Sequence, residues 1–378
     1  MTFPFARERG YFPIVNEKIQ LSSCSQSALS MQVQEAIAAY VDTLRYTGMD
    51  WNLWMDKVEE AKGQFARLIN ASPEEIAVLS SVSDCASSVA TALDFSGERN
   101  QIVTTEMDFP SIGHVWLAQQ KRGAQVQFLP SADSVIPLAY YSESVNEQTL
   151  ITSIPHVSYY NGFKQDVKQI AQIVHKKGSY LFVDAYQSAG SVQIDVKAMD
   201  IDFLAAGVQK YMLGIPGIAF LYVRKEVAEK LTPVVTGWFG RVSPFAFDIK
   251  QLDFAQAARR FETGTPPMIN GYAAAASIGM LNEIGVDRIE AYLQSLSRTA
   301  IAYAQEKGLR VMSPLDLSQK AANTAIYIPQ ASKAEAILKE KGILVSARND
   351  VIRIAPHFYN TEQEVKAAID ALAALGNR

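Results

Sequence analysis

Cysteine is scarce in this chain of 378 residues: Cys24 and Cys85 are the only two. Two cysteines do not make a disulfide framework of the kind that stabilises small secreted domains. No CxxC or clustered Cys/His pattern is present that would bind structural zinc. We therefore expect no metal site and a cytoplasmic location.

The chain also lacks a long apolar run and an excess of either charge. No apolar stretch has the length of a membrane-spanning helix, and the N-terminal residues MTFPFARERGYFPIVNEK do not resemble a signal peptide. The 35 Lys and Arg residues are interspersed with 39 Asp and Glu residues, for a net charge of −4. Nucleic-acid-binding proteins usually have a basic surface, so we expect neither nucleic acid nor a membrane as a partner.

The residues that are present favour an α/β fold. Apolar residues make up 48% of the chain, and its length predicts two domains or one large domain with a smaller companion. Short apolar segments alternate with amphipathic ones up to Val223, which predicts a mainly parallel sheet covered by helices. The predicted strands are 76–79, 101–104, 125–129, 150–154, 180–183, 203–206 and 218–223.

The pattern changes near Pro266, where long helices precede a few short strands. This change predicts a smaller α+β domain in the C-terminal part. We place the large domain at 21–265 and assign 1–20 together with 266–378 to the small domain. Within the large domain, a polar loop over 80–84 is expected to lead into a helix that starts at Cys85.

Asp184 directly follows the predicted strand 180–183. Ligands of open α/β sheets bind at the carboxyl ends of the strands, so an aspartate there is placed to contact one. An aspartate in this position can also cap the next turn. Taken alone, Asp184 favours the capping interpretation.

Lys210 follows the next predicted strand and lies in the apolar stretch Val208–Gly214. A buried lysine is unfavourable unless it is paired, neutral or covalently used. A single lysine is more simply a surface residue, but Lys210 and Asp184 together are more specific. Pyridoxal 5′-phosphate (PLP) needs a lysine that binds its carbonyl carbon and a carboxylate beside its pyridine nitrogen. The pair therefore indicates a PLP enzyme.

Three sequence blocks strengthen this interpretation: VDAYQSAG…DFLAAGVQKYMLGIPGIAFLY, FETGTPP and VIRIAPHFYNTEQEV. In content and order, over residues 21–374, they resemble the class V aminotransferase family of fold type I PLP enzymes. This family includes cysteine desulfurases, kynureninases and isopenicillin-epimerase-like proteins. The resemblance implies a mainly parallel, seven-stranded-type sheet, PLP as cofactor, an amino acid as substrate, and a homodimer with active sites at the interface.

The resemblance also implies roles for single residues. Lys210 corresponds to the lysine that holds the cofactor and moves protons at the substrate Cα. Asp184 corresponds to the partner of the pyridine nitrogen, and Gln187 to the residue that hydrogen-bonds the phenolic oxygen. Ser83 and Asp84 match the loop whose backbone amides bind the phosphate ahead of a helix, which agrees with the anion preference of helix N-termini.

Further roles follow from the same resemblance. Phe109 matches the residue that stacks on the pyridine ring, although a core aromatic remains an alternative. Thr265 resembles a phosphate contact donated across the dimer interface, and Trp238 a kynureninase-type tryptophan near the phosphate or a buried interface aromatic. Arg353 matches the arginine that binds the substrate carboxylate through its planar fork, with Arg348 in reserve. A surface salt bridge is the alternative for Arg353.

Two residues close to Lys210 differ from those that desulfurases usually have. Desulfurases usually carry histidine immediately before it and serine three positions before it, where this chain has Gln209 and Gly207. We keep Gln209 among the expected cofactor-binding residues, with phosphate contacts that are fewer or differently supplied.

A third departure concerns sulfur chemistry. Cysteine desulfurases need a nucleophilic cysteine on a mobile loop shortly before the carboxylate-binding arginine, and 341–354 contains none. Cys24 and Cys85 are more simply interpreted as small structural residues. Persulfide formation is therefore not favoured.

The expected function is that of a PLP-dependent enzyme acting on an amino acid by carbanion chemistry at Cα. Trp238 and Phe109 favour a C–S lyase or kynureninase-like lyase, and aminotransferase, cysteine desulfurase and epimerase remain alternatives. A non-catalytic PLP-binding regulator would carry an additional DNA-binding region, and no basic domain is appended. An inactive scaffold conflicts with the presence of Lys210, Asp184 and Arg353.

Overall fold

The structure, a computed structural model, describes residues 3–376. Its largest element is a seven-stranded sheet with the order β2-β8-β7-β6-β5-β3-β4. The strands are β2 (Ile76–Leu79), β3 (Gln101–Thr105), β4 (Gln125–Leu129), β5 (Thr149–Pro155), β6 (Tyr180–Asp184), β7 (Phe203–Gly207) and β8 (Ala219–Val223). β4, β3, β5, β6 and β7 pair in parallel, while β8 is antiparallel to both of its neighbours. The predicted mainly parallel sheet is confirmed.

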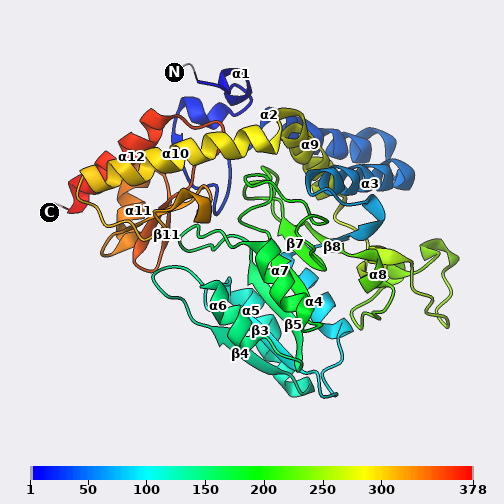
Figure 1. Cartoon of the computed structure of the whole chain (residues 1–378). Helices are drawn as coiled ribbons and strands as arrows, with labels where there is room; N and C mark the ends of the chain where they lie inside the picture. Colours follow the sequence, from blue (N-terminus) through cyan, green and yellow to red (C-terminus); the bar gives the residue numbers. More distant parts are fainter. Residues whose placement is uncertain (1–2, 377–378) are drawn as a thin grey trace.

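Helices cover both faces of this sheet (Figure 1). Two separate hydrophobic clusters lie on the two faces, because successive strand residues point to opposite sides. In β6, Leu181 and Val183 belong to one cluster and Phe182 to the other. Such strands are apolar along their whole length, which explains why the sequence shows continuous runs rather than alternation.

The helices of the chain are α1 (Ala6–Arg9), α2 (Met31–Asp42), α3 (Trp51–Leu68), α4 (Val82–Ala92), α5 (Pro110–Ala118), α6 (Leu138–Ser144), α7 (Val167–Lys176), α8 (Lys225–Ala228), α9 (Met268–Ile284), α10 (Val286–Glu306), α11 (Ala331–Glu340) and α12 (Glu362–Gly376). α4 and α7 contribute to different clusters, and α9 lies beside α2 and α3. Gly48 lies between α2 and α3 and has a φ of 81°, a conformation that glycine adopts without strain. No helix among residues 3–376 has both the length and the apolar character needed to cross a bilayer.

The C-terminal part has its own sheet. Three antiparallel strands, β9 (Thr324–Tyr327), β11 (Ser346–Arg348) and β12 (Val351–Ile354), have the order β11-β12-β9. Figure 1 shows α11 and the paired helices α10 and α12 beside this sheet. The expected smaller α+β part is confirmed. The domain limits at 21–265 stay a prediction.

The N-terminal residues join this C-terminal part. β1 (Ile19–Gln20) pairs in parallel with β10 (Ile343–Leu344). The Arg9 guanidinium donates to the Glu364 carboxylate at 2.9 Å, so the two ends of the chain are also linked by an ion pair. As a result the segment that follows β1, including Cys24 and Ser25, passes close to β12.

Candidate active site

A cavity of about 430 Å³ contains most of the residues predicted to bind the cofactor. It lies where β2, β3, β5, β6 and β7 end, as expected for a ligand site of an open α/β sheet. Its lining includes the predicted residues Lys210, Asp184, Gln187, Ser83, Phe109, Gln209, Arg353 and Arg348. These eight residues come from five separate segments of the chain, which the fold brings to one site.

Lys210 lies three residues beyond the end of β7, with its amine in the cavity. The pKa of this amine is lowered to about 8, mainly by burial and to a lesser extent by the charges of Arg353 and Arg348, while Asp184 opposes the shift. Near neutral pH a larger fraction of the amine is therefore uncharged than in an ordinary lysine. An uncharged amine is the nucleophile that attacks a carbonyl carbon.

Asp184 is the last residue of β6 and is buried. Its Oδ1 accepts a hydrogen bond from the backbone N–H of Tyr186 at 2.8 Å. Burial raises the pKa of this carboxyl, whereas the Tyr186 N–H and the charge of Lys210 lower it. A buried carboxylate of this kind is stabilised by a cation beside it, and a protonated pyridine nitrogen would be such a cation.

Gln187 tests whether the cavity fits PLP. Its Nε2 donates to the backbone carbonyl of Cys24 at 2.9 Å, but its buried Oε1 has no hydrogen-bond partner among residues 3–376. An unpaired buried oxygen is unfavourable, so such atoms usually have a ligand or water as partner. The phenolic group of the cofactor would provide one. The lysine and the carboxylate are the pair that PLP requires, and the amide would contact its phenolic group.

The start of α4 differs from the prediction. We expected a loop over 80–84 and a helix from Cys85, but the helix begins at Val82. The Ser81 hydroxyl accepts the backbone N–H of Asp84 at 3.1 Å and caps the helix. The sequence Ser-x-x-Asp is a known signal for such a cap, so the sequence could have predicted this start.

This change alters the roles of the two residues predicted to bind phosphate. Ser83 lines the cavity, whereas Asp84 does not, because the Ser81 hydroxyl donates to its carboxylate at 2.8 Å. The first N–H groups of a helix have no partner within the helix, and the helix dipole favours an anion beside them. The backbone of Val82 and Ser83 can therefore bind a phosphate, while the side chain of Asp84 is turned to its cap.

Arg353 lies on β12 and is almost completely buried, with 1% of its surface exposed. Its Nη1 donates to the Tyr159 carbonyl at 2.8 Å, and its Nη2 donates to the hydroxyls of Ser25 at 2.9 Å and Ser346 at 2.7 Å. The alternative of a surface salt bridge is therefore wrong. Arg348, in contrast, is exposed at the edge of the same cavity.

Phe109 is 38% exposed and packs edge-on against Tyr159, with 5.1 Å between ring centroids. The alternative of a core aromatic is therefore wrong. Its ring centroid lies 5.6 Å from the amine of Lys210. Gln209 also lines the cavity, and its side chain donates to the Ser25 carbonyl at 3.4 Å.

Trp238 and Thr265 do not line this cavity. Trp238 belongs to an aromatic cluster with Trp51, Phe245 and Phe247, and Thr265 is exposed. Their predicted contacts with the cofactor would therefore have to be made in a second copy of the chain.

Several residues of the cavity were not predicted. Tyr186, Ser25, Ser111 and Tyr159 contribute to the lining, and Ser346 contacts Arg353. Tyr186 lies between two predicted residues, Asp184 and Gln187, and its position could have been noticed. The contact of Ser25 with Arg353 joins chain segments that are 328 positions apart, which the sequence pattern does not reveal.

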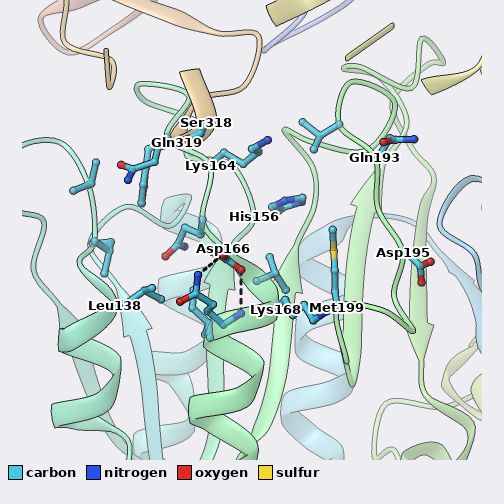
Figure 2. A pocket seen from close by; sticks show the side chains of 18 of the residues that line it. Leu138, His156, Lys164, Asp166, Lys168, Gln193, Asp195, Met199, Ser318 and Gln319 are labelled. Carbon is cyan, nitrogen blue, oxygen red and sulfur yellow. Dashed lines mark hydrogen bonds between the residues drawn. The ribbon is translucent and has the colours of Figure 1, made fainter. Parts of the chain in front are cut away.

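A second cavity, of about 850 Å³, is larger and is shown in Figure 2. Its lining includes His156, Lys164 and Asp166, but none of the residues predicted for the site. Burial and the charge of Lys164 lower the pKa of His156 to about 3, so this ring is neutral. Lys164 pairs with Glu290 at 3.2 Å, and Asp166 caps α7. Its charged groups are therefore largely satisfied within the protein.

Comparisons with known proteins agree with the geometry of the smaller cavity. Residues 29–371 match the sequence profile described as aminotransferase class-V. An uncharacterized aminotransferase, YcbU, of Bacillus subtilis is 46% identical over 97% of this chain and 96% of its own length. A probable cysteine desulfurase of Halalkalibacterium halodurans is 30% identical over 96% of this chain and 94% of its own length.

A solved structure extends the comparison. The apo structure of a cysteine desulfurase from Thermococcus onnurineus has a TM-score of 0.89 and 26% identity, and the match covers 99% of this chain and 98% of that one. The chain belongs to the class V aminotransferase family and is a PLP-dependent enzyme of fold type I.

Proposed function

We propose that this enzyme is a lyase that removes a group from the Cβ of an α-amino acid, within the cavity of Lys210. When bound, PLP supplies a ring that withdraws electrons from the substrate Cα. The residues of the chain then have three tasks: to bind the substrate carboxylate, to remove the Cα proton and to keep the pyridine nitrogen charged.

Arg353 is proposed to bind the substrate carboxylate. Two of its donors are directed at the hydroxyls of Ser25 and Ser346, which lie 2.7 Å from each other. These hydroxyls can rotate, so they can donate to an entering carboxylate while Arg353 supplies its charge. A buried arginine held on three sides also fixes the position of Cα relative to Lys210.

Lys210 is proposed to remove the Cα proton of the bound substrate. A general base is most effective when its pKa lies near the operating pH. Burial lowers the pKa of Lys210 to about 8, which meets this condition. Asp184, which is buried beside it, would keep the pyridine nitrogen protonated.

The turn between β11 and β12 supports a lyase over a persulfide-forming desulfurase. Only Asn349 and Asp350 separate the two strands, and Asn349 has a φ of 48°, as in a tight turn. This short turn offers neither a mobile loop nor a cysteine to accept sulfur. The departing group would then leave the site rather than bind to the enzyme.

Transamination is the second candidate, because the relative with 46% identity is described as an aminotransferase. One experiment separates these reactions: the purified holoenzyme is given a panel of amino acids, and pyruvate, sulfide, alanine and 2-oxo acids are measured together. A β-eliminating lyase gives pyruvate, ammonia and the departing group; a kynureninase-like lyase gives alanine without sulfide, and a desulfurase gives alanine together with sulfide released by a reductant. Formation of the substrate's own 2-oxo acid, dependent on a second oxo acid, would contradict the lyase proposal.

A homodimer with active sites at the interface is also proposed. Exposed apolar residues gather near Trp238, in a segment after α8 that extends from the body of the molecule (Figure 1). They include Val234 at 73%, Phe247 at 72% and Ile249 at 95% exposure. Such a patch usually marks an interaction surface. Phe247→Asp should convert a dimer into a monomer in light scattering, and a wild-type monomer would contradict the proposal. The cytoplasmic location stays a prediction.

A further inference from the structure

Tyr186 lines the cavity between Asp184 and Gln187, and none of the proposed catalytic steps uses its side chain. We propose that Tyr186 binds the cofactor, with its ring beside the pyridine and its hydroxyl donating a hydrogen bond to the phosphate. The inference rests on the proposed PLP site at Lys210. Desulfurases usually carry serine and histidine where this chain has Gly207 and Gln209. Tyr186 would supply part of the phosphate contacts that these two replacements remove.

The phenol of Tyr186 occupies the space beside Gly207, the last residue of β7. A Cβ atom at Gly207 would lie 2.4 Å from Cζ and 2.6 Å from the hydroxyl oxygen of Tyr186. Any side chain at 207 would therefore collide with the tip of the tyrosine. Because residue 207 is a glycine, the phenol has room to lie against the backbone there. This position is three residues before Lys210.

The hydroxyl of Tyr186 is available for a ligand. Within residues 3–376, no hydrogen bond joins it to another protein group, although it lies half-buried at a polar cavity. Burial raises the pKa of Tyr186 to about 12, and the nearby acidic groups of Asp184 and Cys85 add to this shift. The phenol therefore keeps its proton and can only be a donor to an anion.

The anion that the cavity can hold is a phosphate at the start of α4. The residues Ser81, Val82 and Ser83 line the same cavity as Tyr186. Cys85, which contributes to the raised pKa of Tyr186, lies near the start of α4. Helix N-termini bind phosphate through backbone N–H groups. A neutral phenol beside these groups adds a charge-assisted hydrogen bond without adding charge.

The ring of Tyr186 is close to the reactive amine. The amine of Lys210 lies 4.0 Å from the centroid of this ring and 5.6 Å from that of Phe109. The pyridine ring of a cofactor attached to this amine could therefore contact both Tyr186 and Phe109. Aromatic rings favour such contacts in stacked or edge-on arrangements.

A double-mutant cycle tests the contact between positions 186 and 207. Gly207→Ser should weaken PLP binding in the wild-type background, because the new side chain displaces the phenol. In a Tyr186→Ala background the serine side chain no longer collides with a phenol. Its effect on the dissociation constant of PLP should then be at least about tenfold smaller. Equal effects in both backgrounds would mean that the two positions act independently and would overturn the inference.

The hydroxyl is tested by Tyr186→Phe, which keeps the ring. PLP and pyridoxal, which lacks the phosphate, are titrated into cofactor-free protein, and the visible absorbance of the bound cofactor is measured. Loss of one hydrogen bond to a charged group should raise the dissociation constant of PLP by about tenfold to a hundredfold. The affinity for pyridoxal should not change.

Tyr159→Phe is the matched control, because Tyr159 lines the same cavity but contacts Phe109. It should leave the ratio of PLP to pyridoxal affinity as in the wild type. If Tyr186→Phe also leaves this ratio unchanged while the wild type binds PLP, the role of Tyr186 is wrong and the cofactor site stands. If the wild type itself binds no PLP, the proposed cofactor site and the role of Tyr186 both fail.

Discussion

The two cavities near the carboxyl edge of the sheet differ in the environment of their lysines. The larger one, of about 850 Å³, pairs Lys164 with Glu290 and uses Asp166 as a helix cap. The smaller one, of about 430 Å³, holds a lysine whose pKa is lowered by burial and an unpartnered amide oxygen of Gln187. Unpartnered buried atoms do not separate the two cavities, because Nδ1 of His156 in the larger one also has no hydrogen-bond partner among residues 3–376. The difference lies in the lysines: Lys164 has a carboxylate partner, whereas burial lowers the pKa of Lys210 and no ion pair of Lys210 is found among the described residues. A buried amine of this kind marks a candidate site, whereas cavity volume does not.

The largest effect on cofactor binding and activity is expected from the loss of Lys210. Lys210→Ala removes the amine that binds the cofactor and the base that removes the Cα proton. We expect no visible absorbance of covalently bound PLP and a fall in activity of about a thousandfold or more. Absorbance spectra of the purified variant and turnover assays check both. A variant that keeps its colour would place the cofactor lysine elsewhere.

The next largest effect is expected at Arg353. Arg353→Ala should lower kcat/KM for the amino acid by about a hundredfold, because the substrate carboxylate loses its charged hydrogen bonds. PLP affinity should change by less than about tenfold. Arg353→Lys keeps the charge but not the planar fork, and serves as the control for folding and charge. An unchanged KM in both variants would remove Arg353 from the substrate site.

The sequence predicted the sheet and much of the cavity, for physical reasons that can be named. Asp184 is the last residue of β6 and Lys210 follows β7, and strands that are buried on both faces are easily identified by their apolar runs. The contacts of Tyr186 with Gly207, and of Ser25 with Arg353, were not predicted. Such contacts depend on how side chains from distant segments pack, which periodicity does not encode.

The pH dependence of cofactor attachment gives a moderate effect. Burial lowers the pKa of Lys210 to about 8, below the ordinary value of 10.5. The amine attacks only when deprotonated, so the rate of PLP attachment to cofactor-free protein should rise with pH and level off above about 8. The rate is followed by absorbance after mixing at each pH. A rise that continues towards pH 10 would show a solvated lysine rather than one whose pKa is lowered by burial.

The smallest effect on activity is expected from substitutions in the larger cavity. Lys164→Met removes one partner of the ion pair with Glu290, whose side chains are 23% and 19% exposed. Partly exposed pairs contribute at most about 1 kcal/mol to stability, so the melting temperature should fall slightly and kcat/KM should change less than about twofold. Because Glu290 would remain without its cation, Lys164→Met combined with Glu290→Gln should recover most of the stability. A large loss of activity in the double variant would contradict the view that only the smaller cavity supports catalysis.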